Sequence, residues 1–191
     1  EMSDIILKNR GTVDKYIGDA VMAIFGAPVD YPDHAKLACL SALEMHKRLD
    51  ELNRKWIAEG WPEIRCRIGL NTGLAKVGNM GSVRRMDYTA IGDEVNLASR
   101  LEGANKAYGT ALMCSESTFQ DAKEFIEARE LDMLAVVGKQ KPVRVYEVLS
   151  KKGELDEKKM ELLRVYSEGL ELYRQRKFAQ AIQAFKQCLK I

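Results

Sequence analysis

The sequence lacks the features that mark membrane-spanning, nucleic-acid-binding and zinc-binding chains. No apolar run approaches the roughly 20 residues that a membrane-spanning helix needs, so no membrane contact is expected within these residues. The 30 basic and 28 acidic side chains give a formal net charge of +2, which provides no electrostatic basis for binding nucleic acid. With two histidines, and four cysteines that lack C-x-x-C spacing, we expect no zinc site and a reducing, cytoplasmic location.

What is present is typical of a globular domain with an appendage: 191 residues, 46% hydrophobic and 30% charged. Strand and helix patterns alternate without a strict βαβ series, which predicts an α+β sandwich over residues 1–149. A charged linker over residues 150–157 and a helical hairpin over residues 158–191 are expected to follow. The chain begins with Glu1 rather than methionine, in a stretch patterned like a helix end, so we expect a fragment of a longer protein.

The most informative stretch is residues 11–26, in which two apolar runs flank Gly18 and Asp19. This pattern predicts a buried β-hairpin, with Gly18 in the positive-φ conformation of a tight turn. Lys15 and Asp19 place charges in this apolar hairpin, and a buried charge needs a partner, a metal or a ligand. The plain alternative is that Lys15 pairs with Asp14 or Asp19 at the turn.

A predicted helix from Asp93 to about Tyr108 carries Asn96 and Arg100, which are four residues apart and therefore share one face. An amide and a guanidinium near the start of a helix suit a phosphate-bearing ligand, because the planar guanidinium offers two donors to phosphoryl oxygens. The alternative is an exposed asparagine and an arginine paired with Glu102 or Asp93.

Three further segments complete the predicted domain. Alternating apolar residues predict a strand over Ile64–Leu70 with one buried face, and a second strand over Met86–Ile91 contains Thr89. The last predicted hairpin closes with the basic turn Val137–Pro142, which contains Lys139. Lysines in such a turn are often simply solvated.

Two amphipathic helices, Leu162–Gln175 and Phe178–Leu189, are predicted after the linker. Their small and aromatic residues fall at the positions of a tetratricopeptide helix pair: Gly169, Phe178, Ala181 and Phe185. Because one repeat cannot bury its own apolar face, it should pack on the domain, bind a protein partner or continue into further repeats. A plain helical hairpin is the alternative.

Four motifs follow one another along the chain: D-K-Y-I-G-D-A-V-M-A-I-F-G-A-P, I-G-L-N-T-G, D-Y-T-A-I-G-D-E-V-N-L-A-S-R-L-E and G-K-x-x-P-V-x-V-Y-E-V. Together they resemble the class III nucleotidyl cyclases from residue 11 to about residue 149. The resemblance implies a ferredoxin-like α+β catalytic domain that works as a head-to-tail homodimer, with the substrate held between the two chains.

The resemblance also implies roles for matching positions in the first half of the chain. Asp19 matches one of two aspartates that bind a pair of Mg²⁺ or Mn²⁺ ions. Lys15 and Thr89 match the base-recognition pair, and this combination resembles the adenine-selective branch, whereas guanylyl members place glutamate and a small residue there. ATP is therefore the implied substrate and cyclic AMP the implied product.

Three more residues match the groups that handle the ribose and the phosphates. Asn96 resembles the residue that orients the ribose, and Arg100 resembles the one that stabilises charge developing on the α-phosphate. Lys139 matches the family lysine that holds the terminal phosphates.

The chain departs from the family pattern at one point. The first metal aspartate of the family lies on an N-terminal strand, in an F-x-D-x-x-G-F-T stretch that this sequence does not contain. We therefore expect that aspartate upstream of residue 1, and expect the 191-residue chain alone to be inactive. Guanylate cyclase activity, a non-catalytic regulatory or scaffolding role, and an upstream membrane anchor in the longer protein stay open.

Overall fold

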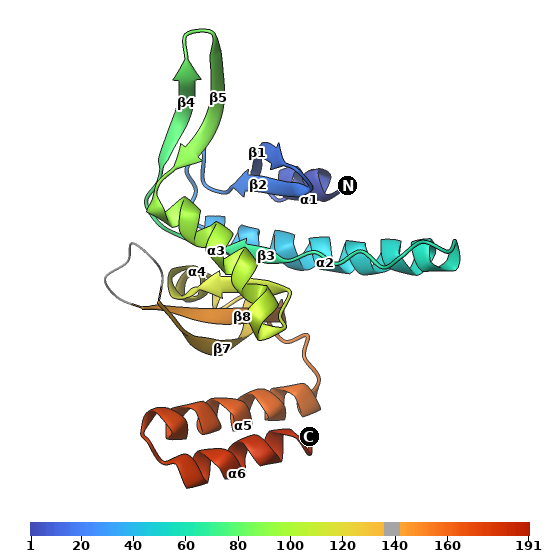
Figure 1. The fold of residues 1–191 in the computed structure, drawn as a ribbon, viewed down its shortest axis with the longest axis vertical. Helices are drawn as coiled ribbons and strands as arrows, with labels where there is room; N and C mark the ends of the chain where they lie inside the picture. Colours follow the sequence, from blue (N-terminus) through green and yellow to red (C-terminus); the bar gives the residue numbers. More distant parts are fainter. Residues whose placement is uncertain (136–141) are drawn as a thin grey trace.

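The computed structural model describes residues 1–135 and 142–191, and its centre is a four-stranded sheet (Figure 1). The strands lie in the order β3 (Ile68–Leu70), β6 (Leu112–Ser115), β8 (Val143–Lys151) and β7 (Ile126–Leu134). β3 runs parallel to β6, whereas β8 is antiparallel to both β6 and β7. Three helices pack on this sheet: α2 (His34–Ala58), α3 (Asp93–Tyr108) and α4 (Glu116–Ala122).

Alternating side chains of β6 build a core on each face of the sheet. Leu112 and Cys114 belong to a buried cluster with residues of α2 and α4, whereas Met113 belongs to a second cluster with residues of α3. Since successive side chains of a strand point to opposite faces, α2 and α4 cover one face and α3 covers the other. The predicted α+β sandwich is confirmed.

The contact between α3 and β3 is unusually close and fixes the helix on the sheet. A Cβ atom at Gly69 would lie 2.3 Å from both Ala98 O and Glu102 N, so only glycine lets the two backbones approach this far. The buried amide of Asn105 donates from Nδ2 to Ile68 O at 3.0 Å. These contacts hold the helix that carries two of the predicted site residues.

The remaining strands form two separate hairpins, β1 (Thr12–Ile17) with β2 (Ala20–Ile24) and β4 (Lys76–Ser82) with β5 (Arg85–Ile91). Gly18, at the β1–β2 turn, has a φ of 62°, as the sequence predicts. The predicted burial of this hairpin is wrong, because among the described strands β1 and β2 pair only with each other and their residues are half-buried or exposed. The β1–β2 hairpin lies beside α1 (Met2–Lys8), and the β4–β5 hairpin extends away from the body of the domain (Figure 1).

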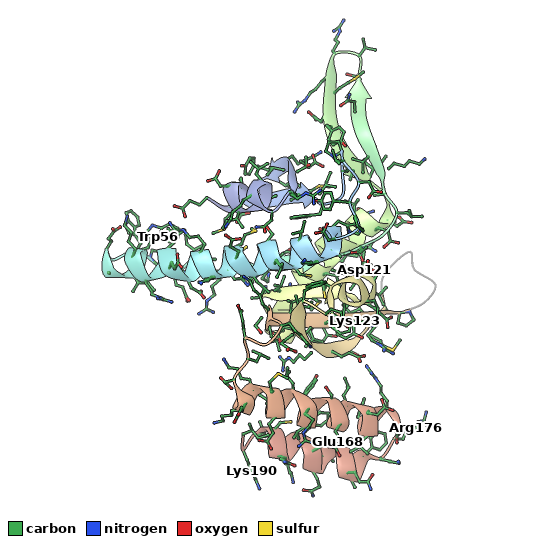
Figure 2. The ribbon with its side chains drawn as sticks, turned by 180° about the vertical axis from the view of Figure 1, so that it is seen from behind. Trp56, Asp121, Lys123, Glu168, Arg176 and Lys190 are labelled. Carbon is green, nitrogen blue, oxygen red and sulfur yellow. The ribbon has the colours of Figure 1, made fainter. Side chains whose placement is uncertain are left out.

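The predicted strand over Ile64–Leu70 is wrong in its first half, because β3 begins only at Ile68. Asn53 of α2 donates to Ile64 O at 2.8 Å and accepts from Ile64 N at 2.9 Å, so a side chain satisfies this backbone. Among the described strands β3 pairs only with β6, and the alternating pattern alone does not supply a second neighbour. The far end of α2, marked by Trp56, projects beyond the sheet (Figure 2).

The predicted C-terminal helix pair is confirmed as α5 (Glu157–Arg174) and α6 (Phe178–Cys188). The rings of Tyr166 and Phe185 lie 5.8 Å apart, and a Cβ at Gly169 would lie 2.9 Å from Phe185 Cε1. Within the part of the chain that the structure describes, no helix has both the length and the apolar character needed to cross a membrane.

Candidate active site

β1 and β5 bring Lys15 and Thr89 to one carboxylate, that of Asp14. Thr89 Oγ1 donates to Asp14 Oδ2 at 2.5 Å, and Lys15 Nζ lies 3.4 Å from Asp14 Oδ1. Thr89 is 8% exposed and the Asp14 side chain 0%, whereas the Lys15 side chain is 39% exposed. The two residues predicted to recognise the base therefore lie together, and the alternative pairing of Lys15 with Asp14 is also present.

An irregularity in β1 accounts for the position of Asp14. Val13 lies opposite Ala23 and Lys15 lies opposite Met22, so Asp14 is an extra residue with no partner across the hairpin. Such a bulge redirects the side chain that it carries, and here the carboxylate of Asp14 reaches Thr89 of β5. Sequence reasoning considered Asp14 only as a partner of Lys15 and missed its contact with Thr89.

Asp19 lies in the tight turn between β1 and β2, and it is exposed. Burial raises the pKa of the Cys66 thiol, and the negative charges of Glu102 and Asp19 raise it further, while Arg67 lowers it. The Asp19 side chain is exposed to solvent at the end of the hairpin.

Asn96 and Arg100 lie on one exposed face of α3, as their spacing predicts. Leu97 and Leu101, between and beside them, are 2% and 0% exposed and anchor the opposite face of the helix in the core. Glu102, one of the partners considered for Arg100, accepts from Arg67 Nε at 2.9 Å.

The first turn of α3 is held by Asn71 and Gly73, whose role sequence reasoning missed. Asn71 Nδ2 donates to Glu94 O at 2.9 Å and to Glu94 Oε2 at 2.8 Å. A Cβ at Gly73 would lie 2.5 Å from Glu94 Cγ, so glycine leaves room for that side chain. The presence of both residues in the I-G-L-N-T-G motif was the available signal, and the contact places Asn96 two residues beyond a fixed point.

The two remaining predicted residues are the phosphate-binding Lys139 and the metal-binding Asp19. Lys139, predicted to hold the terminal phosphates, lies outside the described residues. Asp19 offers the hard oxygen that Mg²⁺ prefers, but no group of three or more His, Cys, Asp or Glu side chains in residues 1–135 and 142–191 could hold a metal. The described residues therefore fit one carboxylate of a metal site, and a two-ion site requires further ligands.

Comparison with known proteins gives a family match to most of the chain. Residues 2–150 match the family described as the adenylate and guanylate cyclase catalytic domain. The chain is 40% identical over 147 residues to "Adenylate cyclase 1" of Rhizobium meliloti, an alignment that covers 77% of this chain and 22% of that protein. The chain thus spans less than a quarter of the length of this relative.

Solved structures of both specificities are similar to this chain. The adenylyl cyclase CyaB from P. aeruginosa has a TM-score of 0.73 and 39% identity, with 81% of this chain and 80% of that chain covered. A dimeric guanylyl cyclase domain of the RhoGC fusion protein from Blastocladiella emersonii has a TM-score of 0.63 and 30% identity, with 79% and 78% covered.

Proposed function

The chain belongs to the family of adenylate and guanylate cyclase catalytic domains, and within that family we propose that it is the catalytic domain of a cytoplasmic adenylate cyclase in signal transduction. The reaction would convert ATP to 3′,5′-cyclic AMP and pyrophosphate. The observation that carries the proposal is the meeting of Lys15 and Thr89 at the Asp14 carboxylate, because it gathers the adenine-selective pair in one place. The 40% identity to a relative named as an adenylate cyclase supports the same choice.

Base recognition follows from the hydrogen-bonding groups of the pair. The Lys15 ammonium can donate to N1 of adenine, which in guanine carries a proton and cannot accept. The Thr89 hydroxyl can accept from the 6-amino group of adenine. A site built for these groups leaves them unpaired beside guanine, and that mismatch is the source of selectivity.

The chemistry is an in-line displacement at the α-phosphate. The 3′-oxygen of the ribose forms a bond to the α-phosphorus, the bond to the bridging oxygen breaks, and pyrophosphate leaves while the 3′ proton passes to solvent. Asn96 orients the ribose, and the Arg100 guanidinium stabilises the negative charge that develops on the α-phosphate. Lys139 holds the terminal phosphates.

Two Mg²⁺ or Mn²⁺ ions, which members of this family typically use, would activate the 3′-hydroxyl and hold the triphosphate when bound. Asp19 is the residue of this chain that we propose as a ligand to them. Its position at the end of an exposed turn leaves the carboxylate accessible to a second chain and to a nucleotide. The second carboxylate is expected from the preceding part of the longer protein.

We further propose that the enzyme is a homodimer with active sites between its chains. Asp19 would come from one chain, and Lys15, Thr89, Asn96 and Arg100 from the other. The helix pair would bind a protein partner, an assignment supported by the exposed apolar side chains that it retains, including Phe178, Ile182 and Leu189.

The test is cyclic nucleotide production by the full-length protein with ATP and GTP offered together, in Mg²⁺ and in Mn²⁺. Cyclic AMP as the dominant product is the expected result, whereas cyclic GMP as the only product would assign the protein to the guanylyl branch. No product from a folded dimer with either metal would refute the proposal and direct attention to α5 and α6. The 191-residue chain assayed alone is expected to be inactive.

A further inference from the structure

We propose that Asp14 is a positioning residue that sets base specificity by holding the Thr89 hydroxyl as a hydrogen-bond acceptor. The inference rests on the proposed function, because it takes Thr89 to be the group that meets position 6 of the purine. It adds a residue that touches neither base nor phosphate and acts through Thr89.

The contact between the two residues has one possible direction of donation. Thr89 Oγ1 and Asp14 Oδ2 are 2.5 Å apart, within the range of a hydroxyl bound to a charged carboxylate. An ionised carboxylate only accepts, so the proton between them is that of Thr89. The ammonium of Lys15 lies 3.4 Å from the other oxygen of Asp14, so the Thr89 proton and the Lys15 charge face different oxygens of the same carboxylate.

The direction of that hydrogen bond determines what Thr89 can offer to a ligand. A threonine hydroxyl has one proton and two lone pairs, and here the proton is committed to Asp14. The group that faces a ligand is therefore an acceptor. It matches the 6-amino group of adenine, which donates, and opposes the 6-carbonyl of guanine, which also accepts.

The backbone of β1 is shaped to keep Asp14 in this role. The bulge between Val13 and Lys15 frees Asp14 from the regular alternation of the hairpin and turns its side chain toward β5. The carboxylate is removed from solvent, so water does not compete for the Thr89 proton. Asp14 Oδ1 accepts no hydrogen bond among the described residues, and Lys15 Nζ is the charge that faces it.

The direct test is Asp14→Asn in the full-length protein, with Asp87→Asn as the matched control. Asp87 is an exposed carboxylate on the same strand as Thr89, two residues away. In Asp14→Asn the amide oxygen would turn toward the Lys15 ammonium and the amide NH₂ toward Thr89, which forces the hydroxyl to accept there and donate outward. We expect the ratio of kcat/KM for ATP over GTP to fall on the order of tenfold, and to stay unchanged in the control.

Purine analogues separate positioning from a general structural effect. Inosine triphosphate has a 6-carbonyl, and purine riboside triphosphate has only hydrogen at position 6. The loss in Asp14→Asn should appear with ATP, vanish with purine riboside triphosphate and become a gain with inosine triphosphate. An equal loss with all three would mean that Asp14 serves only the fold, and would overturn the inference.

The wild-type protein provides a second measurement that does not depend on the folding of a variant. A hydroxyl held as an acceptor predicts that ATP is used best, purine riboside triphosphate less well and inosine triphosphate least. Equal use of inosine triphosphate and ATP would overturn the inference while leaving cyclase activity intact. A wild-type protein that makes no cyclic nucleotide, or that prefers GTP, would refute the proposed function and this inference with it.

Discussion

The two halves of the candidate site, a base half of Asp14, Lys15 and Thr89 and a reaction half of Asp19 and Arg100, differ in how far their side chains are removed from solvent. In the base half, Lys15 and Thr89 both contact Asp14, and the side chains of Asp14 and Thr89 are nearly inaccessible to solvent. In the reaction half, Asp19 and Arg100 lie exposed on separate elements, a hairpin turn and a helix face. The side chains of the base half are buried or half-buried, whereas Asp19 and Arg100 are exposed to solvent.

This difference indicates what each half depends on. A buried carboxylate must be paired when the chain folds, so the base half is preorganised by folding itself. Exposed charges carry no such cost, and their arrangement around a nucleotide can come from a second chain and from metal ions. Specificity should therefore be a property of the single chain, and the rate of reaction a property of the assembled dimer.

The largest effect is expected from Asp19→Asn, which removes the proposed metal ligand. We expect cyclase activity of the full-length protein to fall at least about a thousandfold, because the metal ions lose a carboxylate ligand. The negative charge that develops on the phosphates is then less well stabilised. Asp30→Asn, which changes another exposed aspartate in the loop after the hairpin, should leave activity unchanged. If Asp19→Asn keeps activity within tenfold of wild type, Asp19 is not a metal ligand in this reaction.

Arg100→Ala should be the next most severe change, with kcat lowered about 100-fold because one stabilising donor at the α-phosphate is lost. Lys106→Ala, an exposed cation on the same helix, is the matched control. Mixing Asp19→Asn and Arg100→Ala chains in equal amounts should restore about a quarter of wild-type activity, since half of the dimers would then hold one intact site. No recovery from a confirmed mixed dimer would show that both residues serve the same chain's site.

Lys15→Met tests the base half with a smaller expected effect. The variant keeps an unbranched stem but removes the ammonium, so kcat/KM for ATP should fall about tenfold and that for GTP should change less. Lys76→Met, which changes an exposed side chain of β4, should change neither value. Because Lys15 also faces the buried Asp14, thermal unfolding must be measured beside the kinetics, and Lys15→Glu should lower stability more by adding a second carboxylate.

The sequence predicts well those features of the two halves that depend on short-range geometry. Gly18 between two apolar runs predicts the hairpin turn, and the four-residue spacing of Asn96 and Arg100 predicts their shared exposed face. Both features depend on short-range geometry, which residue type and spacing determine.

The parts that were missed depend on contacts between distant segments. Asp14 reaches Thr89 only because β1 is bulged and β5 lies beside it, and neither property can be derived from the spacing within one strand. Residues 64–67 have a strand-like pattern, but a strand requires a neighbour, and Asn53 binds the Ile64 backbone instead. The same limit applies to Asn71, because its contact with Glu94 of α3 cannot be derived from the I-G-L-N-T-G motif alone.

The smallest effect is expected from Arg174→Ala, which tests whether the contact between α5 and β7 affects base specificity. Arg174 at the end of α5 pairs with Glu130 of β7, and Arg144 Nε lies 3.0 Å from the same Glu130 oxygen. Since these side chains are partly exposed and Glu130 keeps one arginine, the free energy of unfolding should fall by less than about 1 kcal/mol, with Arg164→Ala as control. The ratio of kcat/KM for ATP over GTP should not change, because neither Asp14 nor Thr89 contacts this pair. A shift in that ratio would mean that α5 and α6 act on the base half, and the base specificity of this domain would then depend on residues other than Asp14, Lys15 and Thr89.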